Sequence, residues 1–466
     1  MFNRFTISEY AQIIIFTILG VLSSQTVNLF PTKQSMTGGA NVYIIELVVI
    51  FFSVYVIVYQ LFFKRKLKEM PSSVKYMLLM VIIFGFFFIA MTSLRILTHQ
   101  SLANSMYLPR VVMEAGLIYI CLSFFKVRAE TVFASILTLF VVLNLWDYGI
   151  LFFGNGVIRG TSPVFGNSYV FAIFCSMVAP LLMYFYIKGT KKMKVAMAIL
   201  YVLNIPISIL TGSRTVLILS IGFMFLTILL YSSGIKKMFY YFILVIAPVI
   251  IIAGSFILFA SPQNKSYTFR SFSIPISIVK KVTPESIDKK IDEFTSVEIL
   301  EKKKDVVWKN GKVVSSTEEK EKLVNNSLER ESQVSQFQRE DVNNRAKEEI
   351  QASTQNLLFG SGKSLVLVYS GRLEKPHNYF LQYTLAFGLI GFFLTVLIYF
   401  SPIVFAFKKM NKKDFCFFVL TGYLSVLING QLQPAFGNII AIYLMMIMAY
   451  GLLKWEEGGK YEKNSY

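Results

Sequence analysis

The chain has 466 residues, of which 55% are hydrophobic and only 16% are charged, and it contains 44 Phe and 25 Tyr. A water-soluble domain could not bury so many large apolar side chains in one core, so the composition excludes an ordinary soluble protein. The formal net charge is +19. The sequence therefore predicts a multi-spanning membrane protein whose positive charge has to be explained by its distribution along the chain.

Runs of roughly 20 apolar residues have the length that a helix needs to cross the hydrocarbon layer. Twelve such spans are predicted, near residues 11–29, 42–63, 76–94, 107–125, 131–152, 166–187, 195–210, 214–232, 239–260, 378–407, 414–429 and 435–453. The first run follows Arg4 and lacks a small-residue cleavage site, so we expect a retained span rather than a removed signal peptide. The predicted fold class is an all-α polytopic membrane protein.

Lys and Arg collect in every second short connection between the predicted spans. One set of connections carries seventeen of them, and the other carries five, which are Lys33, Arg95, Arg110, Arg159 and Arg214. By the positive-inside rule, this asymmetry predicts that both termini lie in the cytoplasm. Topology then accounts for much of the net charge, so we expect the lipid bilayer, and no nucleic acid, as a partner.

One predicted external connection, residues 261–376, is far longer than the others. Within it, two β-prone runs flank Asn310-Gly311, a hairpin signal, and residues 340–357 are rich in helix formers. We expect a small α+β external cap, although the charged composition of 316–336 leaves disorder open there. The predicted organisation is nine spans in 1–260, the cap in 261–376, three spans in 377–453 and a cytoplasmic tail in 454–466.

Ionisable residues inside or beside the spans fall almost entirely in the outer halves of the predicted helices. Such groups are costly in a membrane and by default indicate a functional site. They are Glu46, Arg95, Arg110, Glu114, Asp147, Arg159, Arg214 and His377. Arg110 and Glu114 are four residues apart and are expected to neutralise each other. Arg214 follows a tight Thr-Gly-Ser turn, where main-chain N–H groups and a guanidinium could bind one anion, although it could instead anchor a helix end.

The stretch PHNYFLQYTLAFGLIG at 376–391 returns the chain from the polar segment to apolar helix. Its His377 is one of two histidines, and it stands beside Asn378 where water meets membrane. Both residues could merely cap the helix. Alternatively, His377 could transfer a proton, because its ordinary pKa is near neutrality. The other histidine, His99, has no comparable surroundings and is the weaker candidate.

Four elements occur in a fixed order between about 150 and 400: RGTSPVFGNS at 159–168, TGSR at 211–214, Arg345 followed by LFGSG at 358–362, and HNYFLQYTLAFGLIG. With twelve spans and one large external loop, this set resembles the bacterial O-antigen ligase and O-antigen polymerase superfamily. The resemblance implies a metal-independent glycosyltransferase, without a cofactor, that acts on undecaprenyl-diphosphate-linked glycan at the outer face of the bacterial cytoplasmic membrane. It also makes flippase and chain-length regulator proteins candidate partners.

The resemblance implies that Arg214 and Arg345 contact the lipid diphosphate, and that His377 helps proton transfer or acceptor placement. Arg159 and Asn378 are further candidate substrate-binding residues. The residue chemistry agrees, because a departing diphosphate needs its charge held and the planar guanidinium suits phosphate oxygens. No Asp-x-Asp metal motif occurs in the sequence. We expect polymerisation of capsule or exopolysaccharide repeat units.

Three alternatives remain open at this stage. A ligase would use similar chemistry but would transfer a finished glycan to a lipid or wall acceptor. A lipid-linked sugar flippase or transporter would also need many helices, but the chain lacks a visible six-plus-six repeat and its charges lie away from the midplane. A non-catalytic assembly protein would tolerate Arg214→Ala or His377→Ala, whereas the enzyme would not.

Overall fold

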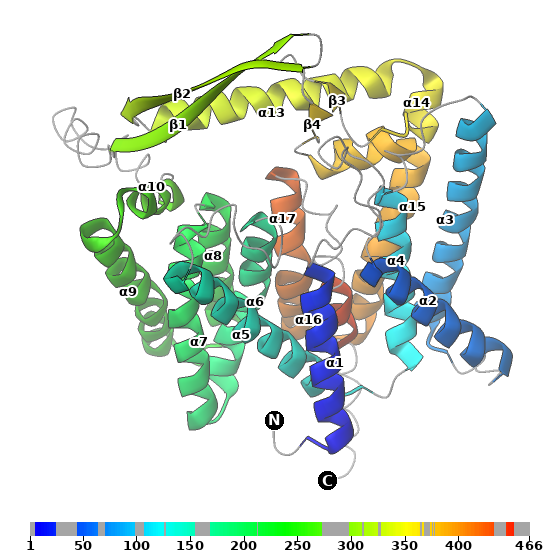
Figure 1. Cartoon of the computed structure of the whole chain (residues 1–466). Coiled ribbons are helices and arrows are strands. Elements are labelled where there is room, and N and C mark those ends of the chain that lie inside the picture. The colour runs from blue at the N-terminus through cyan, green and yellow to red at the C-terminus, as the bar shows by residue number, and fades with distance from the viewer. Residues whose placement is uncertain are drawn as a thin grey trace.

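The computed structural model of the chain is mainly helical, and most of its helices stand side by side in one bundle (Figure 1). It describes residues 5–24, 44–63, 70–97, 107–124, 127–153, 168–211, 213–272, 298–309, 312–324, 328–363, 366–367, 373–374, 376, 378–432 and 444–451.

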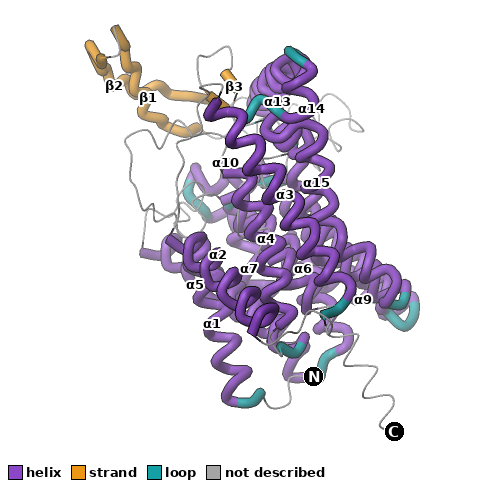
Figure 2. The backbone as a smooth tube through the Cα atoms, turned by 90° about the vertical axis from the view of Figure 1, so that its right-hand side faces the viewer, coloured by secondary structure: helices purple, strands orange, loops and turns teal. Residues whose placement is uncertain are grey.

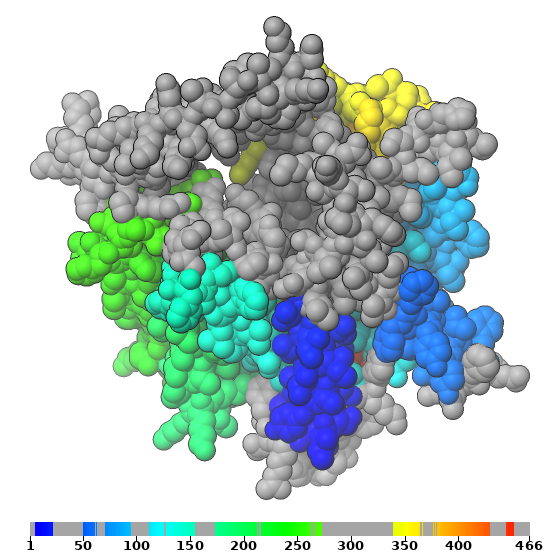
Figure 3. Space-filling model, viewed as in Figure 1, coloured from blue at the N-terminus to red at the C-terminus, as the bar shows by residue number. Residues whose placement is uncertain are grey.

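The bundle is built from helices on both sides of the long polar segment. Those before it are α1 (Ile7–Ser24), α2 (Ile44–Val58) with the π-helix η2 (Tyr59–Phe63), α3 (Ser72–Leu97), α4 (Tyr107–Phe124), α5 (Ala129–Phe153), α6 (Ser168–Lys188), α7 (Lys191–Leu210), α8 (Arg214–Tyr231) and α9 (Ile235–Phe259). Those after it are α15 (Tyr379–Lys409), α16 (Lys412–Phe418), the π-helix η4 (Val419–Leu424), α17 (Ser425–Leu432) and residues 444–451. Figure 3 shows α1 beside α5 on one face of the molecule, and the two helices are in contact.

Five of the described helices are long and apolar enough to cross a membrane, namely Ser72–Leu94, Ala129–Phe153, Lys191–Leu210, Ile235–Phe259 and Phe380–Lys409. Large apolar side chains on them stay exposed, among them Phe86 at 70%, Phe153 at 94% and Ile250 at 64%. Such a surface is unfavourable in water and favourable in lipid. The chain is therefore a membrane-spanning helical protein. Each of the twelve predicted runs overlaps described helical residues, but that all twelve cross the membrane stays a prediction.

The polar segment forms a layer over one end of the bundle, which we call the α13 end. Its elements are α10 (Pro262–Ser271), β1 (Glu298–Lys309), β2 (Lys312–Val324), α13 (Leu328–Gln351), α14 (Thr354–Phe359), β3 (Val366–Leu367) and β4 (Leu373–Glu374). Strands β1 and β2 pair antiparallel around the predicted Asn-Gly turn, with an irregularity between Val307 and Trp308. Figure 2 shows this hairpin projecting from the helices. The β3–β4 pair is also antiparallel.

Three sequence expectations need correction here. The helix expected over 340–357 is divided, because Ser353 interrupts it and its hydroxyl accepts the N–H of Asn356 to cap α14. Described residues of 316–336, for which disorder was left open, belong to β2 and α13. All three cysteines fall in apolar runs of the sequence, where we expect core filler; Cys121 and Cys175 are buried, but Cys416 is exposed.

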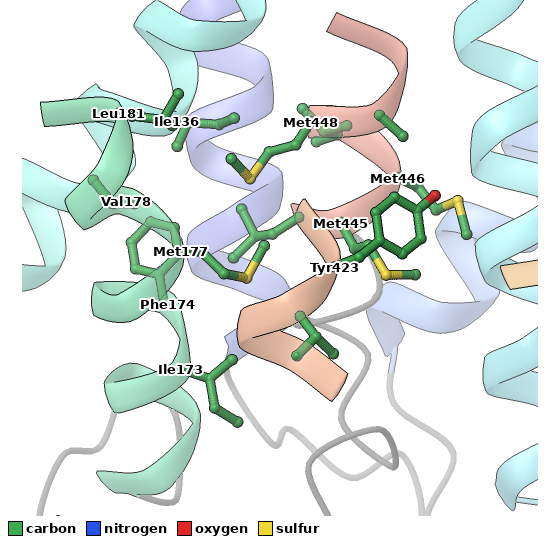
Figure 4. Close-up of a cluster of buried hydrophobic side chains, with 14 of the residues drawn as sticks. Ile136, Ile173, Phe174, Met177, Val178, Leu181, Tyr423, Met445, Met446 and Met448 are labelled. Atoms are coloured by element: carbon green, nitrogen blue, oxygen red, sulfur yellow. The ribbon is translucent and has the colours of Figure 1, made fainter. Parts of the chain in front are cut away.

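One large hydrophobic cluster fills the bundle. Figure 4 shows part of it, where Phe174 and Met177 of α6 lie opposite Tyr423 of η4 and Met445 of the last described helix. A second, small cluster joins α13 to α15 and contains Val342, Ala346, Ile350, Val366 and Leu385. Helix α15 contributes to both clusters, because its neighbouring residues Tyr383, Ala386 and Phe387 belong to the large one. The first turns of α15 therefore connect the α13 layer to the bundle.

Candidate functional site

Two of the sequence motifs, LFGSG and AFGLIG, interlock at the α13 end. Gly360, just after α14, has φ 79°, and Gly388, inside α15, has φ 67° and ψ −173°. A Cβ on Gly360 would lie 2.5 Å from the main chain of Ala386, and a Cβ on Gly388 would collide with the main chain of Leu358. Only glycine accommodates both the positive φ and this close approach. The two motifs are therefore complementary parts of one joint.

Hydrogen bonds complete this joint. The non-helical Gly388 interrupts the i to i+4 ladder of α15, which leaves carbonyl groups just before it in need of donors. The Leu385 carbonyl accepts the N–H of Ser361 at 2.9 Å and its hydroxyl at 3.1 Å. Lys363 then reaches α13, where its Nζ lies 2.7 Å from Oε1 of Glu349. The FGSG turn thus fastens α13, α14 and α15 to one another.

Helix α13 packs its apolar face on the start of α15. Val342, Ala346 and Ile350, spaced at helical intervals, contact the cluster that includes Leu385. The predicted phosphate-binding residue Arg345 lies on this part of α13 with its side chain 33% exposed. Its guanidinium pairs with Glu348, Nη1 to Oε2 at 3.0 Å, so in this structure the arginine is already engaged by a neighbouring carboxylate.

For the polar residues at the start of α15, the sequence left two roles open: capping the helix, or taking part in the reaction. Asn378 is the N-cap of α15, and its Oδ1 accepts the N–H of Leu381 at 3.2 Å. The capping interpretation is therefore right for Asn378. His377 lies outside the described residues, so its role stays a prediction.

One turn beyond Asn378, Gln382 is completely buried. Neither Oε1 nor Nε2 of its amide has a hydrogen-bond partner among the described residues. An unsatisfied buried amide costs on the order of 1–3 kcal/mol, so its retention calls for an explanation such as a bound ligand. Gln382 was not among the residues predicted from the sequence, although a glutamine within the apolar run 379–391 was the available signal.

The TGSR turn joins α7 to α8 as predicted. Thr211 is the C-cap of α7, Ser213 is the N-cap of α8, and Arg214 is the first residue of α8. The side chain of Arg214 lies outside the described part of the structure. The turn is placed beside α10, because the Ser271 hydroxyl of α10 donates to the Ile209 carbonyl of α7 at 2.7 Å. Figures 1 and 2 place α10 and α13 at the same end of the molecule.

A chain of buried polar groups leads through the bundle to this turn. Cys175 Sγ on α6 donates to Asn204 Oδ1 at 3.2 Å, and Asn204 Nδ2 donates to Ser208 Oγ at 3.0 Å. The Thr211 hydroxyl donates to the Ser208 carbonyl at 2.7 Å and accepts the Ser213 N–H at 3.4 Å. Hydrogen-bonded groups that are shielded from water hold a rigid geometry. These hydrogen bonds therefore hold the main chain of the turn that precedes Arg214 in place.

In the sequence, Thr211 and Ser213 belong to the TGSR turn, whereas Cys175, Asn204 and Ser208 look like ordinary members of apolar helices. Cys175 was expected to be core filler, but it takes part in the polar chain. Asp147, counted among the outer charges, is buried on α5 at 1% exposure. Isolated polar residues on α5, α6 and α7 become recognisable as a network only once the helices are assembled.

The predicted site residues divide into those that the structure brings together and those that it leaves undescribed. Arg345 and Asn378 belong to one unit, in which α13 packs on the helix that Asn378 caps. Arg214 starts α8 at the same end of the molecule. Arg159 lies outside the described residues, as do His99 and His377. Glu114 is buried on α4, but the side chain of Arg110 is not described, so their mutual neutralisation stays a prediction.

Comparison with known proteins adds no family assignment: no protein-family model matches the chain, and no curated protein matches it.

Proposed function

We propose that the protein is a glycosyltransferase that polymerises undecaprenyl-diphosphate-linked oligosaccharide repeat units into capsule or exopolysaccharide. In this proposal twelve helices span the bacterial cytoplasmic membrane. The α13 end lies on the outer side of this membrane, and both termini are cytoplasmic. The observation that carries the proposal is the joint between Gly360 and Gly388. At this joint two motifs that resemble those of such enzymes meet, close to the buried Gln382 amide, which has no hydrogen-bond partner among the described residues.

The proposed reaction is a displacement at the anomeric carbon of the donor glycan. The acceptor hydroxyl oxygen forms the new bond to this carbon, while the bond from the carbon to the phosphate oxygen breaks. Undecaprenyl diphosphate leaves with the bonding electron pair, and the hydroxyl proton passes to His377. Arginine is suited to the growing phosphate charge, and we assign Arg214 and Arg345 to this role.

In this scheme the guanidinium of Arg345 has to leave its neighbouring carboxylates before it can bind the diphosphate. Its guanidinium is paired with Glu348 at 3.0 Å and more loosely with Asp341, Nε to Oδ1 at 3.9 Å, on a half-exposed stretch of helix, where such pairs are weak, at roughly 0–1 kcal/mol. A diphosphate offers more charge than a single carboxylate and a bidentate geometry. We therefore expect substrate to draw Arg345 away from Glu348. Asn378 keeps the start of α15 fixed, and Arg159 is assigned to the glycan or diphosphate by resemblance alone.

The test is reconstitution of the purified protein in liposomes with undecaprenyl-diphosphate-linked repeat units. A polymerase converts them into a ladder of lengthened glycans while releasing undecaprenyl diphosphate. His377→Ala and Arg214→Ala should abolish the ladder of lengthened glycans. Neither change should alter insertion of the protein into the membrane or its elution profile on purification. Translocation of the lipid-linked unit without lengthening would identify a flippase, and transfer only to an added lipid or wall acceptor would identify a ligase.

A further inference from the structure

At the end of the bundle opposite α13, helices α5, α6 and α7 enclose an open cavity of about 520 Å³. Its size is within the range of roughly 300–1,000 Å³ that is typical of small-molecule sites. The α6–α7 connection forms its mouth, with Lys188, Thr190 and Lys192 in the lining. The proposed glycosyl transfer uses none of these residues.

The mouth of the cavity is cationic. Lys188 and Lys192 are exposed, and no Asp or Glu is among the described residues that line the cavity. Neither lysine takes part in an ion pair within the described residues, and Lys188 instead places its Nζ 5.7 Å from the ring centroid of Tyr231. The Asp414 carboxylate near this ring is occupied, because its Oδ1 accepts the Tyr231 hydroxyl at 2.9 Å and its Oδ2 accepts Asn411 Nδ2 at 2.6 Å. Two ammonium groups are thus available to a ligand anion.

Apart from Thr138 and Tyr184, the lining beyond the mouth is apolar. Ala134 and Leu137 of α5 and Ala196 and Met197 of α7 line it beyond the lysines. Leu137 and Met197 are buried, whereas Ala134 is half-buried and Ala196 is exposed. A ligand that fits must combine an anionic head with an apolar tail, since a water-soluble anion would leave the apolar wall uncovered.

We propose that this cavity binds one anionic phospholipid, with its phosphate at Lys188 and Lys192 and an acyl chain along the α5–α7 wall. The position supports this ligand. Lys192 stands at the start of α7, which is long and apolar enough to cross a membrane, and Lys188 ends the shorter apolar helix α6, so both lie where head groups meet the hydrocarbon layer. The Thr190 hydroxyl at the mouth is an additional donor to phosphate oxygens. The site is independent of glycosyl transfer at the α13 end.

Native mass spectrometry of the purified protein with phosphatidylglycerol and, separately, phosphatidylcholine tests the proposal. We expect one tightly retained phosphatidylglycerol and at least tenfold weaker phosphatidylcholine binding. Lys188→Gln with Lys192→Gln should weaken phosphatidylglycerol binding at least tenfold, and Lys188→Arg with Lys192→Arg should retain it. The matched control is Lys236→Gln with Lys237→Gln, two exposed lysines at the start of α9 that do not line the cavity, and it should bind like the unmodified protein.

Two further measurements separate a lipid site from general charge attraction. Ala196→Phe, which fills the cavity from its exposed side, should weaken phosphatidylglycerol binding while both lysines remain. Glycerol phosphate, which has the head but no acyl chain, should fail to displace the lipid. Equal loss in the Lys236 and Lys237 control, unchanged binding in Ala196→Phe, or full displacement by glycerol phosphate would each overturn the proposal.

Discussion

A Cβ atom on Gly360 would lie 2.5 Å from the amide nitrogen of Gly388, so the two glycines allow α14 and α15 to touch through their main chains. This contact explains why the sequence has glycine at both positions, 28 residues apart in the chain but joined in the fold. Gly391 allows a second close approach of α15, in this case to α3, because a Cβ there would lie 2.7 Å from the ring of Phe87.

Gly388→Ala should destabilise the protein by about 2 kcal/mol or more. The alanine would adopt a positive φ and its Cβ would strike the Leu358 main chain, which cannot move aside as a flexible side chain could. Thermal unfolding in detergent measures the loss. Gly222→Ala is the matched control, since no atom of the described residues lies within 4 Å of a Cβ there and alanine is the better helix former. Equal stability of the two variants would contradict the proposed joint.

Gln382→Met should raise stability and lower transfer. The change removes the unsatisfied amide from the core, which is worth roughly 1–3 kcal/mol, and it keeps a side chain of similar shape. If the amide binds substrate, turnover should fall about tenfold or more. Unfolding temperature and the rate of glycan lengthening are measured on the same preparation. A stabilised variant with unchanged turnover would show that Gln382 is outside the reaction.

Arg345→Lys should lower turnover by an order of magnitude or more, and Arg214→Lys should do the same. Lysine keeps the charge but loses the bidentate geometry, and each charge-assisted contact is worth roughly 1.5–3 kcal/mol. Arg339→Lys, on the same helix as Arg345, is the control and should keep the wild-type rate. Normal turnover in both the Arg214 and Arg345 variants would remove the arginines from the proposed site.

His377→Asn should leave folding intact and lower transfer roughly 100-fold or more, the usual size of a general-base contribution. The structure sharpens this test because Asn378 already supplies the cap of α15. Asn378→Ala should therefore cost about 1 kcal/mol of stability, whereas Asn378→Ser should keep the cap. Wild-type lengthening by His377→Asn in purified membranes would refute proton transfer by His377.

Labelling with a membrane-impermeant thiol reagent should reveal the orientation in intact cells. The exposed Cys416 should first be replaced by serine, to remove its background signal. Asn310→Cys and Gln431→Cys should then react, and Lys191→Cys should not, because the lysine asymmetry predicts that residue 191 is cytoplasmic. Reaction at residue 191 without permeabilisation would overturn the proposed topology.

Local sequence signals predicted the approximate positions of the apolar helices, the α7–α8 turn at Thr211 and the strands flanking Asn310-Gly311, but not α10 or the start of α13. These features depend on neighbours in the chain. The break at Gly388 was not predicted, since an apolar run looks uninterrupted when the main chain that approaches it, at Leu358, is distant in sequence. The link from Cys175 on α6 to Asn204 on α7 was missed for the same reason, because it joins two helices that are distant in sequence.

The small cluster between α13 and α15 has a consequence for dividing the molecule experimentally. A fragment that ends at Pro376 would include Val342, Ala346 and Ile350 but would lack Leu385, which covers them. It would also lose the Leu385 carbonyl that accepts Ser361. Such a fragment would expose an apolar stripe and is expected to aggregate. A fragment that continues through Gly388 retains both partners, so the boundary for expressing the polar layer lies inside α15.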